Sequence, residues 1–127
     1  MATRKNISSG SPYEPVIGFS RAVLIGNRVL VSGTAPVWPD GHCDPDPAAQ
    51  TKRCIEIILA ALKQAGASAD DVVRTRVYIT DAKNADTIGK AHGELFGKIR
   101  PASTMVVVAA LLDKRWHLEM EAEAVLP

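Results

Sequence analysis

Two amphipathic helical patterns, separated by a single β-strand pattern, constrain the fold of this chain more than any other feature. The first helix is predicted to begin where Asp46 can cap it and Pro47 can occupy its first position, and to end at Gly66. The second is predicted after Asp81 and ends at Gly97. The apolar positions at helical spacing are Ile55, Ile58, Leu59, Leu62 and Ala65 in the first, and Ile88, Ala91, His92, Leu95 and Phe96 in the second.

Strand patterns surround these helices. Residues 22–25 and 29–31 flank Gly26-Asn27, a dipeptide that favours a tight hairpin. Residues 104–108 and 116–125 predict two more strands, joined by a charged turn at 113–115. Residues 72–80 alternate as a half-buried strand, with Val73, Thr75, Val77 and Ile79 on one face and Arg74, Arg76 and Tyr78 on the other.

The order β-β-α-β-α-β-β predicts an α+β two-layer sandwich, with a mixed sheet and both helices on one face. We expect residues 1–17 to be an extended N-terminal arm, order to begin near Phe19, and residues 18–127 to form a single domain. The other face of the sheet would then be uncovered. In the last strand His117, Glu119, Glu121 and Glu123 alternate with apolar residues, so self-association is predicted.

Length and charge exclude several classes of protein. A chain of 127 residues fits one domain, and its net charge of +1 argues against a nucleic-acid partner. The longest apolar run, 105–112, is far short of the roughly 20 residues that cross a bilayer. The N-terminus has no signal-peptide pattern, so a cytoplasmic location is expected.

Motifs for a metal or a phosphate are not evident. The chain has no phosphate-binding glycine loop and no Gly-x-Ser-x-Gly pattern. His42, Cys43, Asp44 and Cys54 match no zinc spacing, so no metal site is predicted and both cysteines are expected to be free thiols.

Two candidate chemical groups each allow two interpretations. The row of glutamates on the last strand is either a solvated face paired with Arg74 and Arg76, or a source of a general acid or base. For the second role Glu119 is the candidate, because its apolar neighbours would raise its pKa. His92 is predicted to point inward, either as a hydrogen-bonded core histidine or as a functional one.

Several segments together resemble one known family. They cover residues 18–125 in order, and they are Gly26–Thr34, Gln50, Ala65–Ser68, Asp71–Asp81, Arg100–Ala102 and Leu118–Ala122. The chain resembles the RidA family, also called YjgF/YER057c/UK114, in a branch that lacks the substrate-binding arginine. The resemblance implies a chorismate-mutase-like fold, a homotrimer with an inner barrel, small-molecule clefts between subunits, and no cofactor. It also implies hydrolysis of enamines and imines to a 2-keto acid and ammonia.

The resemblance assigns roles to residues on the matching positions. Glu119 matches the glutamate that activates water. Ser32 and Gly33 would orient the ligand, and His92 would help to shape the pocket. The other matching positions carry different residues from the family's, namely Phe19 for a tyrosine, Gly89 for an asparagine, Ser103 for the arginine and Met105 for a cysteine.

The presence of Ser103 in place of an arginine leaves two functional hypotheses. A hydroxyl lacks the guanidinium geometry that binds a carboxylate, which argues against classical 2-imino acid deamination. The leading hypothesis is still a trimeric hydrolase or deaminase of small reactive metabolites, with Arg76 or Arg100 as a substitute charge and the N-terminal arm as a possible cover. The alternative is a non-catalytic metabolite-binding or regulatory trimer. The ribonuclease label of the family fits the near-neutral charge poorly.

Overall fold

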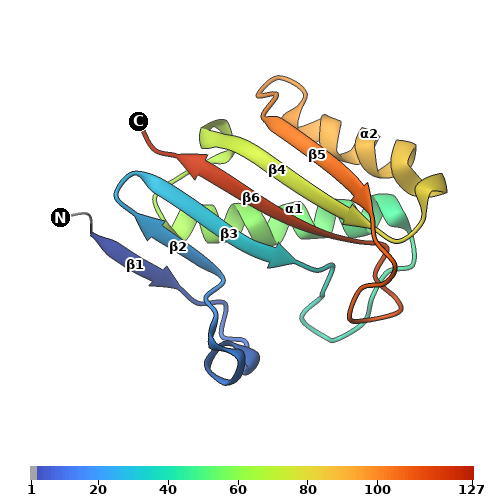
Figure 1. Ribbon diagram of the computed structural model, residues 1–127, viewed down its shortest axis with the longest axis horizontal. Helices are drawn as coiled ribbons and strands as arrows, with labels where there is room; N and C mark the ends of the chain where they lie inside the picture. Colours follow the sequence, from blue (N-terminus) through green and yellow to red (C-terminus); the bar gives the residue numbers. More distant parts are fainter. Residues whose placement is uncertain (1–2) are drawn as a thin grey trace.

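The computed structural model describes residues 3–127, which form a sheet covered by two helices (Figure 1). The sheet has the order β1-β2-β3-β6-β4-β5, in which only β4 and β5 are parallel neighbours. The elements, in chain order, are β1 (Arg4–Ile7), η1 (Glu14–Gly18, a π-helical turn), β2 (Ala22–Ile25), β3 (Arg28–Thr34), α1 (Pro47–Gln64), η2 (Ala69–Asp71), β4 (Val72–Ile79), η3 (Ala82–Asn84), α2 (Ala85–Phe96), β5 (Ala102–Val107) and β6 (Leu118–Val125).

Local sequence signals place the hairpin and both helices as predicted. Gly26 has φ +60°, the left-handed conformation that a tight turn between β2 and β3 requires. The Asp46 side chain accepts a hydrogen bond from the backbone N–H of Ala49, and Pro47 is the first residue of α1. Gly97 directly follows α2. The two-layer α+β sandwich is therefore confirmed.

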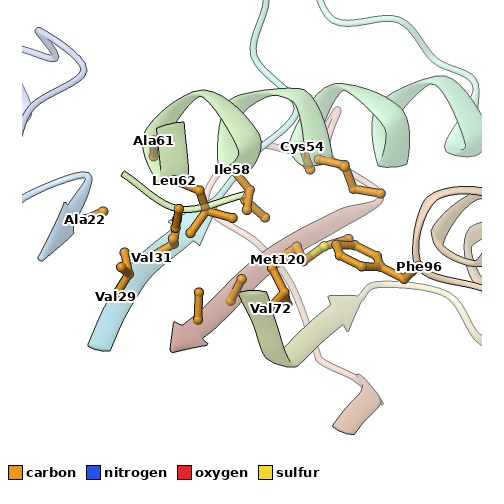
Figure 2. Packing of buried hydrophobic residues seen from close by; sticks show 14 of the residues in the cluster. Ala22, Val29, Val31, Cys54, Ile58, Ala61, Leu62, Val72, Phe96 and Met120 are labelled. Atoms are coloured by element: carbon orange, nitrogen blue, oxygen red, sulfur yellow. The ribbon is translucent and has the colours of Figure 1, made fainter. Parts of the chain in front are cut away.

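The core lies between the helices and one face of the sheet, which we call the helix face (Figure 2). The side chains of β6 alternate strictly, and those at even positions are buried on this face. Ile58 and Leu62 of α1 and Phe96 of α2 are buried against it. The opposite face, called the open face, carries the odd positions of β6 and has no helix over it.

The N-terminal segment is more ordered than predicted. Order does not begin near Phe19, because β1 already pairs with β2 along the edge of the sheet. A strand of four residues with only Ile7 buried is too short to show a periodic pattern in the sequence. The segment also includes the turn η1, so residues 1–17 are not simply extended.

The prediction for the first part of β4 was wrong at one residue. Val73 was predicted on the buried face of β4, but it is 45% exposed. The pairing with β6 shifts register between Val72 and Arg74, and this bulge turns Val73 outward. From Thr75 onward the predicted alternation is confirmed. The last strand begins at Leu118 rather than at residue 116, and β5 spans Ala102–Val107.

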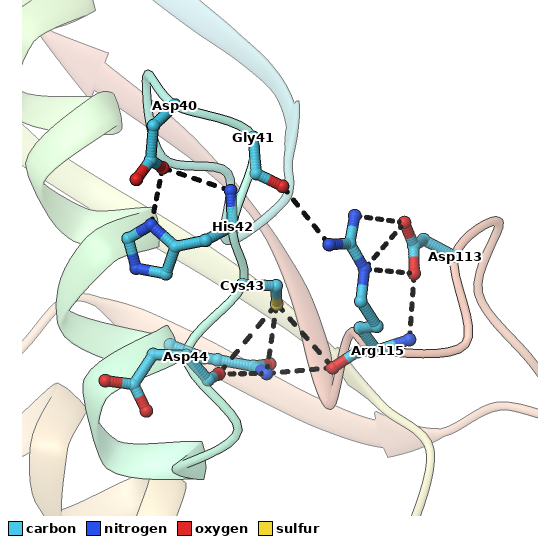
Figure 3. A network of polar contacts seen from close by, with 8 residues as sticks. Asp40, Gly41, His42, Cys43, Asp44, Asp113 and Arg115 are labelled. Carbon is cyan, nitrogen blue, oxygen red and sulfur yellow. Dashed lines mark hydrogen bonds and ion pairs between the residues drawn. The ribbon is translucent and has the colours of Figure 1, made fainter.

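Gln50 joins two loop segments from inside the protein, the one before α1 and the one before β6. Its side-chain N–H groups donate to the carbonyl oxygens of Asp44 and Arg115, both at 2.8 Å, and its Oε1 accepts from the backbone N–H of His117 at 2.7 Å. Figure 3 shows the surrounding contacts, in which the Cys43 thiol lies against the same two carbonyl groups. Cys43 and Cys54 are both free thiols.

Gln50→Leu is expected to destabilise the protein by about 1–3 kcal/mol for each buried polar group left without a partner. Chemical unfolding measures the loss. Gln64→Leu is the matched control, because Gln64 is exposed at the end of α1 and its side chain forms none of these bonds. Equal stability of the two variants would contradict a structural role for the Gln50 contacts.

No helix within residues 3–127 has the length and apolar character needed to cross a membrane.

Candidate functional site

The glutamates of β6 have different environments on the open face. Arg76 Nη1 lies 3.2 Å from Glu121 Oε1 and 3.7 Å from Glu123 Oε1, and Tyr78 donates its hydroxyl hydrogen to Glu121 at 2.8 Å. Arg28 also pairs with Glu123, at 3.3 Å. The prediction of a paired, solvated row is therefore correct for these two glutamates, with Arg76 as the partner rather than Arg74.

Glu119 differs from the other two. Within residues 3–127 no arginine or lysine lies within 4.0 Å of its carboxylate. The side chain is half-buried over Gly33, where an added Cβ would lie 3.0 Å from Glu119 Oε2. Burial raises the pKa of Glu119, as the sequence predicted, and Arg21 opposes this shift. A half-buried carboxylate that is not held by an ion pair can accept a proton from water.

Gly33→Ala is expected to move the Glu119 carboxylate while leaving the fold intact. The new Cβ would meet the flexible end of a side chain and no backbone atom, so Glu119 can shift by a few tenths of an ångström. A titration of the Glu119 carboxyl carbon by NMR should show a pKa different from that of the wild type. Gly93→Ala is the control, because a Cβ there meets nothing within 4 Å; an unchanged Glu119 titration in Gly33→Ala would contradict the contact.

Arg21 is the residue near this carboxylate that the sequence did not indicate. Its Nη2 donates to the carbonyl oxygen of Gly33 at 2.6 Å, so it holds the backbone over which Glu119 lies. Arg21 directly precedes the short apolar run of β2. A single arginine in that position has no sequence pattern that would mark it as a site residue. The pairing of β3 with β6 shifts register between Val31 and Thr34, and the Gly33 carbonyl group that Arg21 contacts lies within this irregular stretch.

Ser32 and Phe19 adjoin the same corner of the molecule. The Ser32 hydroxyl donates to the carbonyl oxygen of Ser20 at 2.7 Å, and its backbone N–H donates to that of Arg21. Phe19 is half-buried, directly after η1. These contacts place Ser32 and Gly33 with Glu119 in a first group of candidate residues, which Phe19 adjoins through Ser20.

The remaining candidates form a second group around α2 and β5. The Thr75 hydroxyl lies 2.7 Å from Ser103 Oγ and 2.9 Å from His92 Nε2, so the three side chains form one hydrogen-bond chain. Thr75 is fully buried, whereas Ser103 is exposed. Burial lowers the pKa of His92, which therefore remains neutral at pH 7 and can either donate to or accept from Thr75.

Gly89 and Met105 complete this second group. Gly89 lies one turn before His92 in α2, and a Cβ there would meet nothing within 4 Å. Met105 follows Ser103 by two positions in β5, so both point to the same side, and Met105 packs against the core. His92 also lies beside Phe96, with ring centroids 4.7 Å apart.

The two groups lie on opposite faces of the sheet. Ser103 is paired with Thr75, which is paired with Ala122, and directly paired residues share a face. Ala122 belongs to the helix face, whereas Glu119 belongs to the open face. A single chain therefore does not bring Ser103 and Glu119 into one pocket.

Arg76 and Arg100, which the sequence suggested as substitutes for the missing arginine, lie in different places. Arg76 is engaged by Glu121 and Glu123 on the open face. Arg100 is exposed beyond the end of α2, where its backbone has φ +57° and its N–H donates to the carbonyl oxygen of Phe96. Within residues 3–127, no three or more histidine, cysteine, aspartate or glutamate side chains are placed to hold a metal ion.

Comparison with known proteins identifies the family. A family profile described as Endoribonuclease L-PSP matches residues 10–126. The chain belongs to this family, also called RidA or YjgF. A crystal structure of a RidA-family (YjgF/YER057c/UK114) member from Mycobacterium tuberculosis matches with a TM-score of 0.90 and 44% identity, covering 98% of this chain and 100% of that one. The chorismate-mutase-like sandwich that the resemblance implied is thus confirmed.

Two relatives show the range of RidA-family proteins that this chain resembles. An uncharacterised protein of Streptomyces coelicolor is 38% identical, covering 94% of this chain and 90% of its own length. The 2-iminobutanoate/2-iminopropanoate deaminase of Escherichia coli is 30% identical, covering 95% of this chain and 97% of its own length. The similarity extends over nearly the whole chain in both cases.

Proposed function

We propose that this chain is a RidA-type hydrolase that forms homotrimers and acts on C–N bonds of small reactive metabolites in clefts between subunits. The observation that carries the proposal is Glu119, a half-buried carboxylate with a raised pKa and no ion-pair partner among residues 3–127. The similarity to a named imine deaminase supports the reaction class.

The proposed chemistry needs one base and one water molecule. Glu119 takes a proton from water, and the hydroxide oxygen adds to the imine carbon, which gives a carbinolamine. Glu119 then returns its proton to the nitrogen, the C–N bond breaks, and the nitrogen leaves as ammonia with the hydroxyl proton of the carbinolamine, so that a carbonyl group remains and Glu119 is ionised again. Ser32 and the backbone of Gly33 orient the substrate beside the carboxylate.

The division of the candidates between two faces supports a site shared by two subunits. Glu119 and Ser103 are separated by the sheet in one chain, so a complete cleft requires Ser103, His92, Gly89 and Met105 from a neighbouring copy. The open face, with exposed Leu30 beside charged residues, is the surface that a trimer would cover.

Ser103 sets the expected substrate preference. Its hydroxyl is already held by Thr75 and carries no charge, so it binds a substrate carboxylate less strongly than an arginine would. We therefore expect slow hydrolysis of 2-iminopropanoate by the wild-type protein, and faster hydrolysis by Ser103→Arg.

The test measures ammonia and keto-acid release from freshly generated 2-iminopropanoate. Wild-type protein, Ser103→Arg and Glu119→Gln are compared with buffer alone. A rate above buffer that rises in Ser103→Arg and disappears in Glu119→Gln supports the proposal. If neither the wild type nor Ser103→Arg exceeds the buffer rate, the deaminase proposal is wrong.

A second candidate function is metabolite binding without catalysis. It is favoured by the chain of hydrogen bonds from Ser103 through Thr75 to His92, which gives the expected cleft a neutral polar wall. This function predicts that a ligand raises the melting temperature without turnover, and that Glu119→Gln retains binding. Loss of all ligand binding in Glu119→Gln would contradict it.

A further inference from the structure

A hollow of about 480 Å³ lies between the N-terminal segment, the loop after β3 and helix α1. Its walls include Ser9 and Ser11 on one side, Trp38 on another, and the side chains of Arg21 and Arg53. The volume is within the range of small-molecule sites, about 300–1,000 Å³. Two guanidinium groups lining one hollow give it a positive character.

Arg21 has an incompletely satisfied charge. Its side chain is partly buried, and among residues 3–127 only the carbonyl oxygen of Gly33 accepts a hydrogen bond from its guanidinium group, from Nη2. Nε is buried without any hydrogen-bond partner, and no carboxylate within residues 3–127 lies at ion-pair distance from the group. Burying a cation in this way is costly unless a counter-charge is close.

The neighbouring acids do not remove this charge. Glu14 and Glu119 are the carboxylates that act on Arg21 at longer range. Glu14 is occupied by Ser9, accepting from its backbone N–H at 3.0 Å and from its hydroxyl at 2.8 Å. Glu119 lies over Gly33. Within residues 3–127, Arg21 therefore has unused donors and no carboxylate at ion-pair distance.

Arg53 is fixed in a similar way. Its Nε donates to the carbonyl oxygen of Val37 at 2.6 Å, and its Nη1 lies 3.3 Å from Glu56 Oε2. Glu56 is largely exposed, so water screens this ion pair. Arg21 and Arg53 are thus each anchored to a carbonyl group of the segment 33–37, and their positions are set before any ligand arrives.

We propose that this hollow binds a small oxyanion, a carboxylate or a phosphate group, between Arg21 and Arg53. Guanidinium groups bind both kinds of anion through paired N–H groups, and the hydroxyl of Ser11, which accepts a hydrogen bond from the backbone N–H of Tyr13, can donate its own hydrogen at the rim. Trp38 gives an apolar surface for the body of the ligand. The hollow adjoins Gly33 and Glu119 through Arg21, but anion binding there does not require imine hydrolysis.

The test titrates the full-length protein with inorganic phosphate, with pyruvate and with neutral pyruvamide, and follows the indole N–H signal of Trp38 by NMR. We expect saturable shifts with at least one anion and none with pyruvamide. A response to phosphate alone identifies a phosphate-bearing ligand, and a response to pyruvate alone identifies a carboxylate. Binding should weaken at high salt.

Variants establish which residues bind the anion. Arg53→Gln and Arg21→Gln should each weaken binding about ten- to a hundredfold, the loss expected for a charge-assisted hydrogen bond. Lys98→Gln is the control, because Lys98 is exposed, follows the end of α2 and does not line the hollow, so this change should leave binding unaltered. Arg53→Gln suffices if Arg21→Gln fails to fold. The proposal is overturned if neither anion gives a saturable shift, or if Arg53→Gln binds as tightly as the wild type.

Discussion

Glu119→Gln is expected to lower the rate of imine hydrolysis about a hundredfold to ten-thousandfold, the usual contribution of a general base. Glutamine keeps the shape of the side chain over Gly33 but has no lone pair basic enough to take a proton from water. Rates of ammonia release at saturating substrate give the effect on turnover. The fold should persist, because in the described part of the chain the carboxylate makes no ion pair that the change would break.

Glu121→Gln is the matched control for this experiment. Glu121 lies two positions further along the same face of β6, but Arg76 and Tyr78 hold it. Its loss should cost no more than about 1 kcal/mol of stability and little activity. Equal loss of activity in the two variants would show that the glutamate row acts through its overall charge and would remove Glu119 as the base.

The pH dependence follows from the raised pKa of Glu119. Because the ionised carboxylate is the base, the rate should fall as the pH drops through this raised value. Between the pKa of the unfolded chain and that of the folded protein, the folded state binds more protons. The stability contribution of this group is therefore lost as pH rises through that interval.

Glu119→Gln removes this pH-dependent contribution, so at neutral pH the variant should be at least as stable as the wild type. Melting curves at several pH values test the sign. A stability that falls more steeply with pH in the variant than in the wild type would contradict burial as the cause of the shift.

Leu62→Ala is expected to destabilise the protein by about 2–5 kcal/mol. Leu62 is fully buried between α1 and the sheet, and the deletion leaves a cavity in addition to the lost transfer free energy (Figure 2). Since total stability is typically about 5–15 kcal/mol, this is a large fraction of it. Denaturant unfolding monitored by circular dichroism measures the change.

Leu112→Ala is the same chemical change at a site that is 97% exposed. Its effect should stay within about 0.5 kcal/mol. Comparable losses at the two leucines would mean that α1 does not form the centre of the core.

Short-range sequence signals were sufficient to predict both main helices and most of the strands. Asp46, Pro47 and Gly26 act through their own backbone or through neighbours three residues away, so their roles are visible in a short window of sequence. The bulge at Val73 was not predictable in this way, because it depends on how β4 pairs with β6. The strand β1 was missed for a similar reason, since its partner β2 lies well beyond it in the chain.

The candidate site was predictable only in part. The sequence correctly indicated a raised pKa for Glu119 but not its cause, because Leu118 and Met120 point to the helix face whereas the Glu119 side chain is half-buried on the open face, over Gly33. Arg21 and Thr75 were not identified. Each contacts residues from other elements, Gly33 for Arg21 and both His92 and Ser103 for Thr75, and such contacts leave no periodic pattern.

By itself the sequence determined the order of the two main helices and of the strands from β2 onward, the cap at the start of α1 and the alternation of β6, because these depend on periodicity and on neighbours a few residues apart. The tertiary structure alone decided that β5 runs parallel to β4 and that Glu119 and Ser103 lie on opposite faces of one sheet. It also placed Arg21 and Arg53 around one hollow. The physical reason is that strand pairing and loop packing join residues far apart in the chain.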